Sequence, residues 1–212
     1  MTGFVTPLTT RWGSRGPEAP LIVVFVDCAV APGDTSDRDI ATFARYLPDG
    51  AAYALVRLPL DWPDDGGQVV AWFRGWLDEQ QSLQVPVVLV GFGGGATFAG
   101  GQLLADPERF AAAALLYGTL PFDAGLPMTR GRLFDVPVFL THGVHDLVVP
   151  ADLQRRTWDY LVRESGSPLW TQREPGGHEL TAKTVTGLAG WIEARLGFLQ
   201  RQGQPVSDRA EP

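Results

Sequence analysis

The sequence predicts an α/β protein, a three-layer α/β/α sandwich with a mostly parallel central sheet. Short apolar runs rich in Val, Ile and Leu alternate along the chain with segments whose apolar residues recur at helical spacing. The runs are nearly continuous, as in parallel strands that are covered on both faces. The 212 residues fit a single domain. We place this domain at residues 1–200 and expect the polar tail at 201–212 to be disordered.

Seven segments are predicted to be strands. The first is an edge strand, because the Thr-, Gly- and Pro-rich start of the chain carries little apolar pattern. The others are buried, and Leu21–Val26 shows this best, with six apolar residues in succession. The predicted strands lie near 4–8 and at 21–26, 52–58, 86–90, 111–117, 136–140 and 169–172.

Five segments are predicted to be helices. Ser36 and Asp39 resemble a capping box before the first of them, which ends at Pro48. The second has apolar residues at positions i, i+3, i+4, i+7 and i+8, so its Trp and Phe side chains are expected in the core. Pro150 suits the first position of the fourth. The predicted helices cover about 36–47, 69–77, 96–105, 150–161 and 185–199.

In a parallel sheet, ligands bind at the edge where the strands end. The loops expected at that edge are 27–33, 91–95, 118–124, 141–146 and 174–178. The candidate functional residues all lie in them.

Composition excludes several classes of function. The formal net charge is −7 and no basic stripe is present, which argues against a nucleic-acid partner. The single cysteine, Cys28, and three histidines show no metal-ligand spacing, so we expect no metal and no other cofactor. No apolar run approaches the ~20 residues of a membrane span. No signal peptide is recognisable, and we expect a cytoplasmic protein.

Three motifs follow one another along the chain. They are Gly91-Phe-Gly-Gly-Gly-Ala96, His142-Gly-Val-His-Asp-Leu-Val-Val-Pro150 and Gly176-Gly-His178. They resemble the Gly-Phe-Ser-x-Gly-Ala elbow, the acid loop and the histidine loop of the phospholipase/carboxylesterase branch of the α/β-hydrolases. The resemblance runs from about Leu21 to Leu196. It implies the α/β-hydrolase fold, with Asp146 and His178 as the acid and histidine of a catalytic triad.

The chain departs from that family in three places. The nucleophile position holds Gly93 instead of serine. Asp27-Cys28 stands where the family has His-Gly beside an oxyanion donor. The segment between Leu58 and Trp72 is shorter than is usual in this branch, so we expect a more open site.

The missing serine limits the chemistry of the site. In a serine triad the serine attacks, histidine carries its proton and aspartate orients the ring. Losing the serine of a comparable hydrolase costs about 10⁶-fold in rate. A positioned histidine base is still worth roughly 10² to 10⁴. With Gly94 as half of an anion site and a side-chain-sized space at Gly93, the site suits proton abstraction, elimination, ring closure or isomerisation.

Asp27 and Cys28 each have two interpretations. Asp27 is a second catalytic acid or base, or it caps a turn that faces solvent. Cys28 lines the site as a nucleophile reached by His178, or it is a small core residue. We expect Phe92, Gly93 and Gly94, together with Cys28, to contact the substrate or an anion.

The leading functional hypothesis is a serine-less enzyme. His178, Asp146 and Asp27 would act on a small carbonyl compound, as a lyase, cyclase, isomerase or water-activating hydrolase. One alternative is a catalytically inactive binding protein that kept the fold, and another is a hydrolase with a different nucleophile. A homodimer is the expected assembly if the chain self-associates. Gly91, Gly93 and Ala96 also match a dinucleotide fingerprint, but they follow a middle strand, which disfavours that reading.

Overall fold

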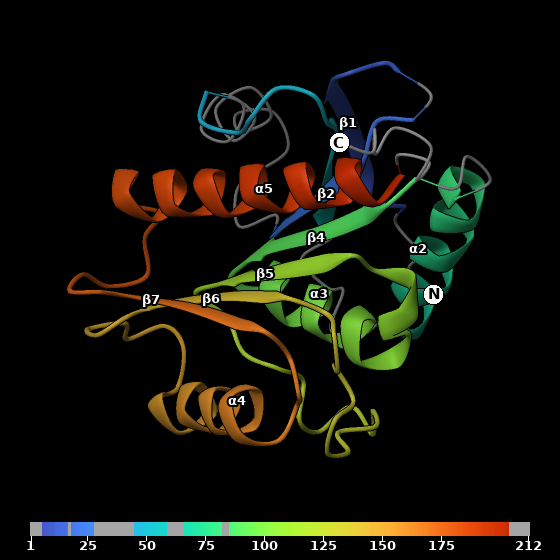
Figure 1. Cartoon of the computed structure of the whole chain (residues 1–212). Coiled ribbons are helices and arrows are strands. Elements are labelled where there is room, and N and C mark those ends of the chain that lie inside the picture. The colour runs from blue at the N-terminus through green and yellow to red at the C-terminus, as the bar shows by residue number, and fades with distance from the viewer. Residues whose placement is uncertain (1–5, 17, 28–44, 59–65, 82–84, 204–212) are drawn as a thin grey trace, which may run out of the picture.

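The computed structural model describes residues 6–16, 18–27, 45–58, 66–81 and 85–203. These residues build one seven-stranded sheet in the order β1-β3-β2-β4-β5-β6-β7, with helices on both faces (Figure 1). The predicted three-layer α/β/α class is therefore confirmed. The strands are β1 Leu8–Gly13, β2 Leu21–Asp27, β3 Ala52–Leu58, β4 Val87–Phe92, β5 Ala112–Leu116, β6 Val138–Gly143 and β7 Leu169–Glu174. The helices are α2 Gly66–Gln81, α3 Gly94–Ala105, α4 Ala151–Arg163 and α5 Ala182–Gly203, with a short 3₁₀ turn at Pro107–Arg109.

The order of the strands reverses between β2 and β4. β3 pairs with one side of β2, and the chain then returns through α2 to place β4 on the other side. Only β1 is antiparallel, so β2 to β7 all end at the same edge of the sheet. A reversal of this kind opens a crevice at the carboxyl ends of the two strands that flank it. The glycine motif after β4 lies at that position.

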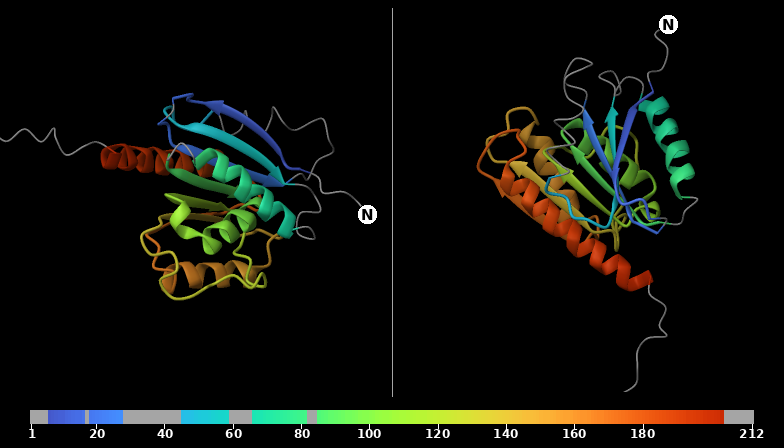
Figure 2. Two further views of the ribbon diagram at one scale, coloured as in Figure 1. Left: turned by 90° about the vertical axis from the view of Figure 1, so that its right-hand side faces the viewer. Right: turned by 90° about the horizontal axis from the view of Figure 1, so that it is seen from above.

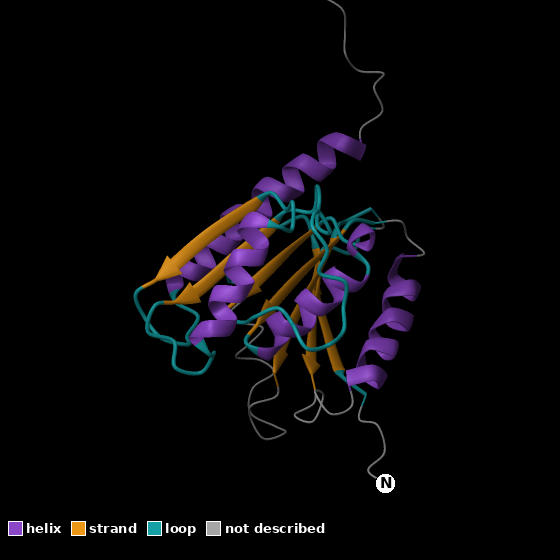
Figure 3. Cartoon of the chain, turned by 90° about the horizontal axis from the view of Figure 1, so that it is seen from below, coloured by secondary structure: helices purple, strands orange, loops and turns teal. Residues whose placement is uncertain are grey.

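The two faces of the sheet are covered unequally. Helices α2, α3 and α4 pack on one face, and Figure 3 views the molecule from that side. Among the described helices, α5 covers the other face and lies over the sheet in the right-hand view of Figure 2. The helices bury residues at i, i+4 and i+8, such as Val69, Phe73 and Leu77 in α2. The corresponding residues of α5 are Leu188, Ile192 and Leu196.

Some predicted boundaries were wrong. The edge strand is Leu8–Gly13 and not the segment near 4–8, because its register is set by antiparallel pairing with β3 and by Trp12, which stacks on Tyr53 at 5.2 Å. β6 continues to Gly143, so His142 lies in a strand and not in the acid loop. α5 continues to Gly203, and the first residues of the expected tail are therefore helical. The helix expected at 36–47 falls almost wholly outside the described residues.

Candidate active site

The backbone at Gly93 makes a sharp turn between β4 and α3. Its φ is 60° and its ψ is −126°, a conformation that residues with a side chain rarely adopt. The Gly93 amide donates to the carbonyl oxygen of Leu116 at 3.0 Å, and its carbonyl oxygen accepts the Ala96 amide at 3.0 Å. The turn thus keeps the geometry of a nucleophile elbow although no nucleophile is present.

Glycines on either side of the turn allow α3 to approach the sheet closely. A Cβ at Gly91 would overlap the carbonyl oxygen of Gly95, and a Cβ at Gly95 would overlap the carbonyl oxygen of Phe25. A Cβ at Gly118, in the loop after β5, would overlap the carbonyl oxygen of Gly93. Three backbone segments therefore meet around the turn at distances that only glycine permits.

The carboxylate of Asp146 is completely buried just after β6 and holds His178. Its Oδ1 accepts the amides of Val148 at 2.8 Å and Val149 at 3.0 Å, and its Oδ2 lies 2.9 Å from Nδ1 of His178. Burial by itself would raise the pKa of Asp146. The Val149 amide, the His178 ring and the Val148 amide outweigh burial, and the pKa of the carboxyl falls below its ordinary value. Asp146 is therefore ionised at neutral pH.

The ionised state of Asp146 determines the tautomer of a neutral His178 ring. A carboxylate can only accept hydrogen bonds, so Nδ1–H must be the donor in this contact. Nε2 then carries the lone pair that a general base needs. The His178 side chain is 17% exposed, so part of the ring is accessible to solvent. The side chain of its partner Asp146 is completely buried.

The loop that carries Asp146 and the loop that carries His178 are joined through their backbones. The Val144 amide donates to the carbonyl oxygen of Glu174 at 2.7 Å, and the His145 amide donates to that of Gly176 at 3.0 Å. Gly143 is required here, because a Cβ would overlap the carbonyl oxygen of Gly177. The two loops lie side by side at the left edge of Figure 1. The predicted pair of acid and histidine is thus brought together by contacts that neither motif contains alone.

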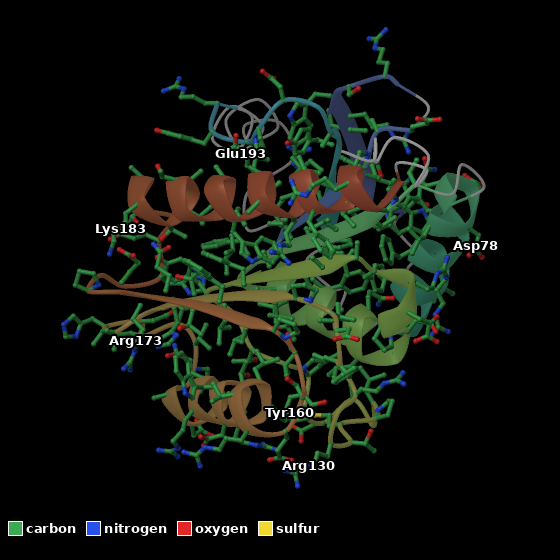
Figure 4. All side chains as sticks on the ribbon, in the orientation of Figure 1. Asp78, Arg130, Tyr160, Arg173, Lys183 and Glu193 are labelled. Atoms are coloured by element: carbon green, nitrogen blue, oxygen red, sulfur yellow. The ribbon has the colours of Figure 1, made fainter. Side chains whose placement is uncertain are left out.

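Glu174 anchors the base of the histidine loop. Its buried carboxylate accepts a hydrogen bond from Nε2 of Gln172 at 2.7 Å and lies 3.1 Å from Nζ of Lys183. The pKa of Glu174 is lowered, first by the Gln172 hydrogen bond and then, against the effect of burial, by Lys183. Lys183 is in the first turn of α5 and is labelled in Figure 4. Glu174 therefore ties β7 to α5 across the loop that carries His178.

Two aromatic rings pack around the His178 imidazole. The Phe92 ring is 5.0 Å away from it between centroids, and the Tyr117 ring is 6.0 Å away at an interplanar angle of 72°. Phe92 was expected at the site because it belongs to the glycine motif. Tyr117 was missed. Its signal is a Tyr-Gly pair directly after a buried strand, at the edge where the other candidates lie.

Of Asp27 and Cys28, the structure describes the backbone of Asp27 alone. Phe25 of β2 pairs with Gly91 of β4. Asp27 comes two residues after Phe25, and Gly93 comes two residues after Gly91, so the two residues are at the same level on neighbouring strands. The backbone of Asp27 is thus beside the turn, while its side chain and Cys28 lie outside the described residues. Gly94 begins α3 at this same turn.

The structure also places the other two histidines. Nε2 of His142 accepts a hydrogen bond from Nε of Arg173 at 3.2 Å, and the ring packs on Trp158 at 5.9 Å. Burial and the neighbouring Arg173 lower the pKa of His142, which agrees with the structural role expected for it. His145 is exposed in the acid loop.

The described residues contain neither a metal-binding cluster nor a membrane-spanning helix. No group of three or more His, Cys, Asp or Glu residues within the described ranges is arranged to hold a metal ion. None of the helices that the structure describes has both the length and the apolar composition needed to cross a membrane.

Solved structures similar to this chain include esterases and an acyl-protein thioesterase. A carboxylesterase from Bacillus cereus superposes with a TM-score of 0.69 at 18% identity, over 89% of this chain and 94% of its own. A phospholipase/carboxylesterase from Dyadobacter fermentans gives a TM-score of 0.70 at 13% identity, over 90% and 99%. Acyl-protein thioesterase 2 from Zea mays gives 0.66 at 18% identity, over 90% and 99%. At these identities the likeness shows a common fold.

A family model identifies the chain more closely than the structures do. A search of curated proteins found no match. The model of the phospholipase/carboxylesterase family matches residues 74–195, more than half of the chain. The matched region contains the turn at Gly93, Asp146 and His178. The chain therefore belongs to the phospholipase/carboxylesterase family of the α/β-hydrolase superfamily.

Proposed function

We propose that this protein is an enzyme that works without a serine nucleophile and uses His178 as a general base on a small carbonyl compound. The observation that carries the proposal is the 2.9 Å contact between Nδ1 of His178 and a fully buried Asp146 carboxylate. A buried carboxylate with three hydrogen-bond partners orients the ring and stabilises the imidazolium that forms when Nε2 takes a proton.

Because Gly93 has no side-chain oxygen, acyl transfer through a serine is not the reaction proposed. Acyl transfer by a serine triad needs a hydroxyl group at the turn, and glycine has none. A base can instead remove a proton next to a carbonyl group, which leads to elimination, ring closure or isomerisation, or it can activate water for hydrolysis. Phe92 and the turn at Gly93 and Gly94 would contact the substrate, with Cys28 as a further candidate.

Asp27 is proposed as a second acid or base. The support is its place in the backbone, since β2 brings it beside the turn at the same level as Gly93. A carboxyl group there would protonate the developing alkoxide or enolate, or hold a water molecule. Replacing Asp27 by Asn removes its proton transfer and keeps its size, so one limb of the pH–rate profile should disappear.

Deuterium exchange tests the proposal without knowledge of the product. Small ketones, ketoacids and lactones are incubated in D₂O with the full chain, and NMR follows deuterium uptake next to the carbonyl group. We expect His178→Ala to lose roughly 10²- to 10⁴-fold in rate. His145→Ala is the matched control, because His145 is an exposed histidine of the adjoining loop. An undiminished rate in His178→Ala would rule the proposal out.

Hydrolysis needs a separate assay. The same variants are tested on simple esters and lactones in H₂¹⁸O, with mass spectrometry to locate the label. If water activated by His178 is the nucleophile, the label appears in the product acid and no acyl group is found on the protein, whereas an acyl intermediate on Cys28 would increase the mass of the quenched protein. Turnover of none of these compounds by the wild-type chain would favour the alternative of an inactive binding protein.

A further inference from the structure

Tyr117 occupies a constrained position directly after β5. It is 1% exposed, and its φ of 52° lies in the left-handed region that a bulky residue rarely adopts. Such a conformation is strained and persists only where the surroundings enforce it. The contacts of Tyr117 must therefore hold it in this conformation.

The backbone around Tyr117 connects the turn at Gly93 with the strand that leads to Asp146. The carbonyl oxygen of Leu116 accepts the Gly93 amide at 3.0 Å, and the Tyr117 amide donates to the carbonyl oxygen of Thr141 at 2.9 Å. Gly118 follows in direct contact with the Gly93 backbone. The left-handed residue is thus held from both neighbouring strands.

The hydroxyl of Tyr117 is held by the start of α5. It lies 2.9 Å from Oγ1 of Thr184, which in turn lies 3.0 Å from Oγ1 of Thr181. Thr181 also accepts the Thr184 amide at 3.1 Å. Burial raises the pKa of Tyr117, so the phenol is neutral. Because its hydroxyl is bonded to Thr184 and buried, Tyr117 is not placed to exchange a proton with the substrate.

The ring of Tyr117 completes an aromatic cradle, which we define as Phe92 and Tyr117 around His178. Phe92 and Tyr117 are 5.7 Å apart between centroids, and both contact the imidazole. The hydrogen bond to Asp146 holds one atom of that ring and leaves the ring free to tilt about the bond. Packing against two rings from different directions removes this freedom.

We propose that Tyr117 is a positioning residue for His178, which holds the tilt of the imidazole while Asp146 holds its Nδ1. The importance of this positioning for catalysis rests on the proposed function. The positioning of the His178 ring by Tyr117 does not depend on that function. Tyr117 thus connects the turn at Gly93, the strand β6 that leads to Asp146, and the loop that carries His178.

The test measures the His178 ring directly. Exchange of its Nδ1–H with water is followed by NMR on histidine-labelled full-length protein. Tyr117→Leu removes the ring contact, and we expect exchange to rise about three- to tenfold. Tyr117→Phe keeps the ring and loses only the Thr184 bond, so it should restore most of the protection. Tyr160→Phe is the matched control, since Tyr160 is also a buried tyrosine with a bonded hydroxyl, on α4 (labelled in Figure 4).

The outcomes separate positioning from general stability. A lower melting temperature in all three variants with unchanged Nδ1–H exchange would overturn the proposal. If Tyr117→Leu fails to fold by circular dichroism, Tyr117→Met replaces it, since it also removes the ring, and its exchange must then exceed those of Tyr117→Phe and Tyr160→Phe. Deuterium uptake by the carbonyl compounds is measured separately. Turnover that survives in His178→Ala would defeat the proposed function and leave the positioning role intact.

Discussion

At the scale of the residue, Gly93 combines the backbone of a nucleophile elbow with the absence of a nucleophile. Its φ of 60° and ψ of −126° are costly for a residue that has a side chain. Glycine adopts them freely. The neighbours that enforce the turn, at Gly91, Gly95 and Gly118, are all still glycines. The turn therefore has the backbone geometry that would present a nucleophile, and residue 93 carries no side chain.

Restoring serine at this position should reduce stability and create a new activity. We expect Gly93→Ser to unfold more easily by roughly 1–3 kcal/mol, because the side chain enters a strained conformation. It should also hydrolyse p-nitrophenyl acetate, since serine would stand next to an oriented histidine. Urea denaturation and an absorbance assay measure the two effects. Gly93→Ser/His178→Ala is the control, and equal hydrolysis by the double variant would contradict the second expectation.

The buried carboxylate of Asp146 predicts how stability depends on pH. Its folded-state pKa lies below the value of about 3.9 in the unfolded chain. The stabilisation that it supplies is complete above about pH 4 and is lost as the pH falls through the lower, folded-state pKa.

Asp146→Asn should therefore lower the free energy of unfolding at pH 7 and flatten the loss of stability below pH 4. Urea midpoints measured between pH 7 and pH 3 check this. Asp152→Asn makes the same charge change at an exposed position of α4. If the acid limb of Asp146→Asn were as steep as that of the wild type, the hydrogen bonds to Asp146 would not supply the stabilisation described here.

At the scale of the element, α3 explains how the turn is supported. Nearly all of its residues are small or apolar and buried, and it packs against β2, β4 and β5. Its Gly95 touches the backbone of Phe25 in β2 without an intervening side chain. This close crossing carries the first turn of α3 to the carboxyl end of the sheet. The glycines of the motif thus shape the site even without a catalytic side chain.

Substitutions of two glycines in α3 should have opposite effects. Gly95→Ala forces a Cβ into the Phe25 carbonyl group, and we expect a loss of roughly 1–3 kcal/mol in the free energy of unfolding. At Gly101 the nearest atom to a Cβ would be Cγ of Pro121 at 3.4 Å, an ordinary contact. Gly101→Ala should gain about 0.5–1 kcal/mol, because alanine restricts the unfolded chain. Parallel urea titrations would refute this account if both variants lost the same stability.

At the scale of the whole molecule, the site is assembled where five parallel strands end. β4 and β5 are covered on both faces and flanked by strands on both sides, and the residues of β5 are all buried. β1 lies at one edge and is largely exposed or half-buried. The turn at Gly93 and Tyr117 therefore rest on the most enclosed strands, and the His178 loop follows the edge strand β7.

Hydrogen exchange should reflect this arrangement. Amides of β4 and β5 should exchange most slowly, through global unfolding, and those of β1 should exchange fastest among the strands. Mass spectrometry of peptic fragments at several times measures the order. Equal protection of β1 and β5 would show that the edge strand is part of the same cooperative unit.

Most strands and helices could be predicted because their apolar patterns are local. β2, β3 and α2 follow from runs and periodicities within a few residues. β1 was misplaced, because a half-exposed edge strand takes its register from its partner β3 and not from its own pattern. The last helix was predicted too short for a related reason, since the polar residues that end α5 continue a helix already formed.

The sequence by itself determined the fold class, the family likeness, the pairing of Asp146 with His178 and the absence of serine at Gly93. Each of these depends on residue identity and on the order of short motifs. The tertiary structure alone decided that Tyr117 contacts His178, that Glu174 ties the histidine loop to α5, and that Gly93 keeps a left-handed turn. These features arise between residues far apart in the chain. Their contacts are set by the order in which the strands pair in the sheet, which no local pattern records.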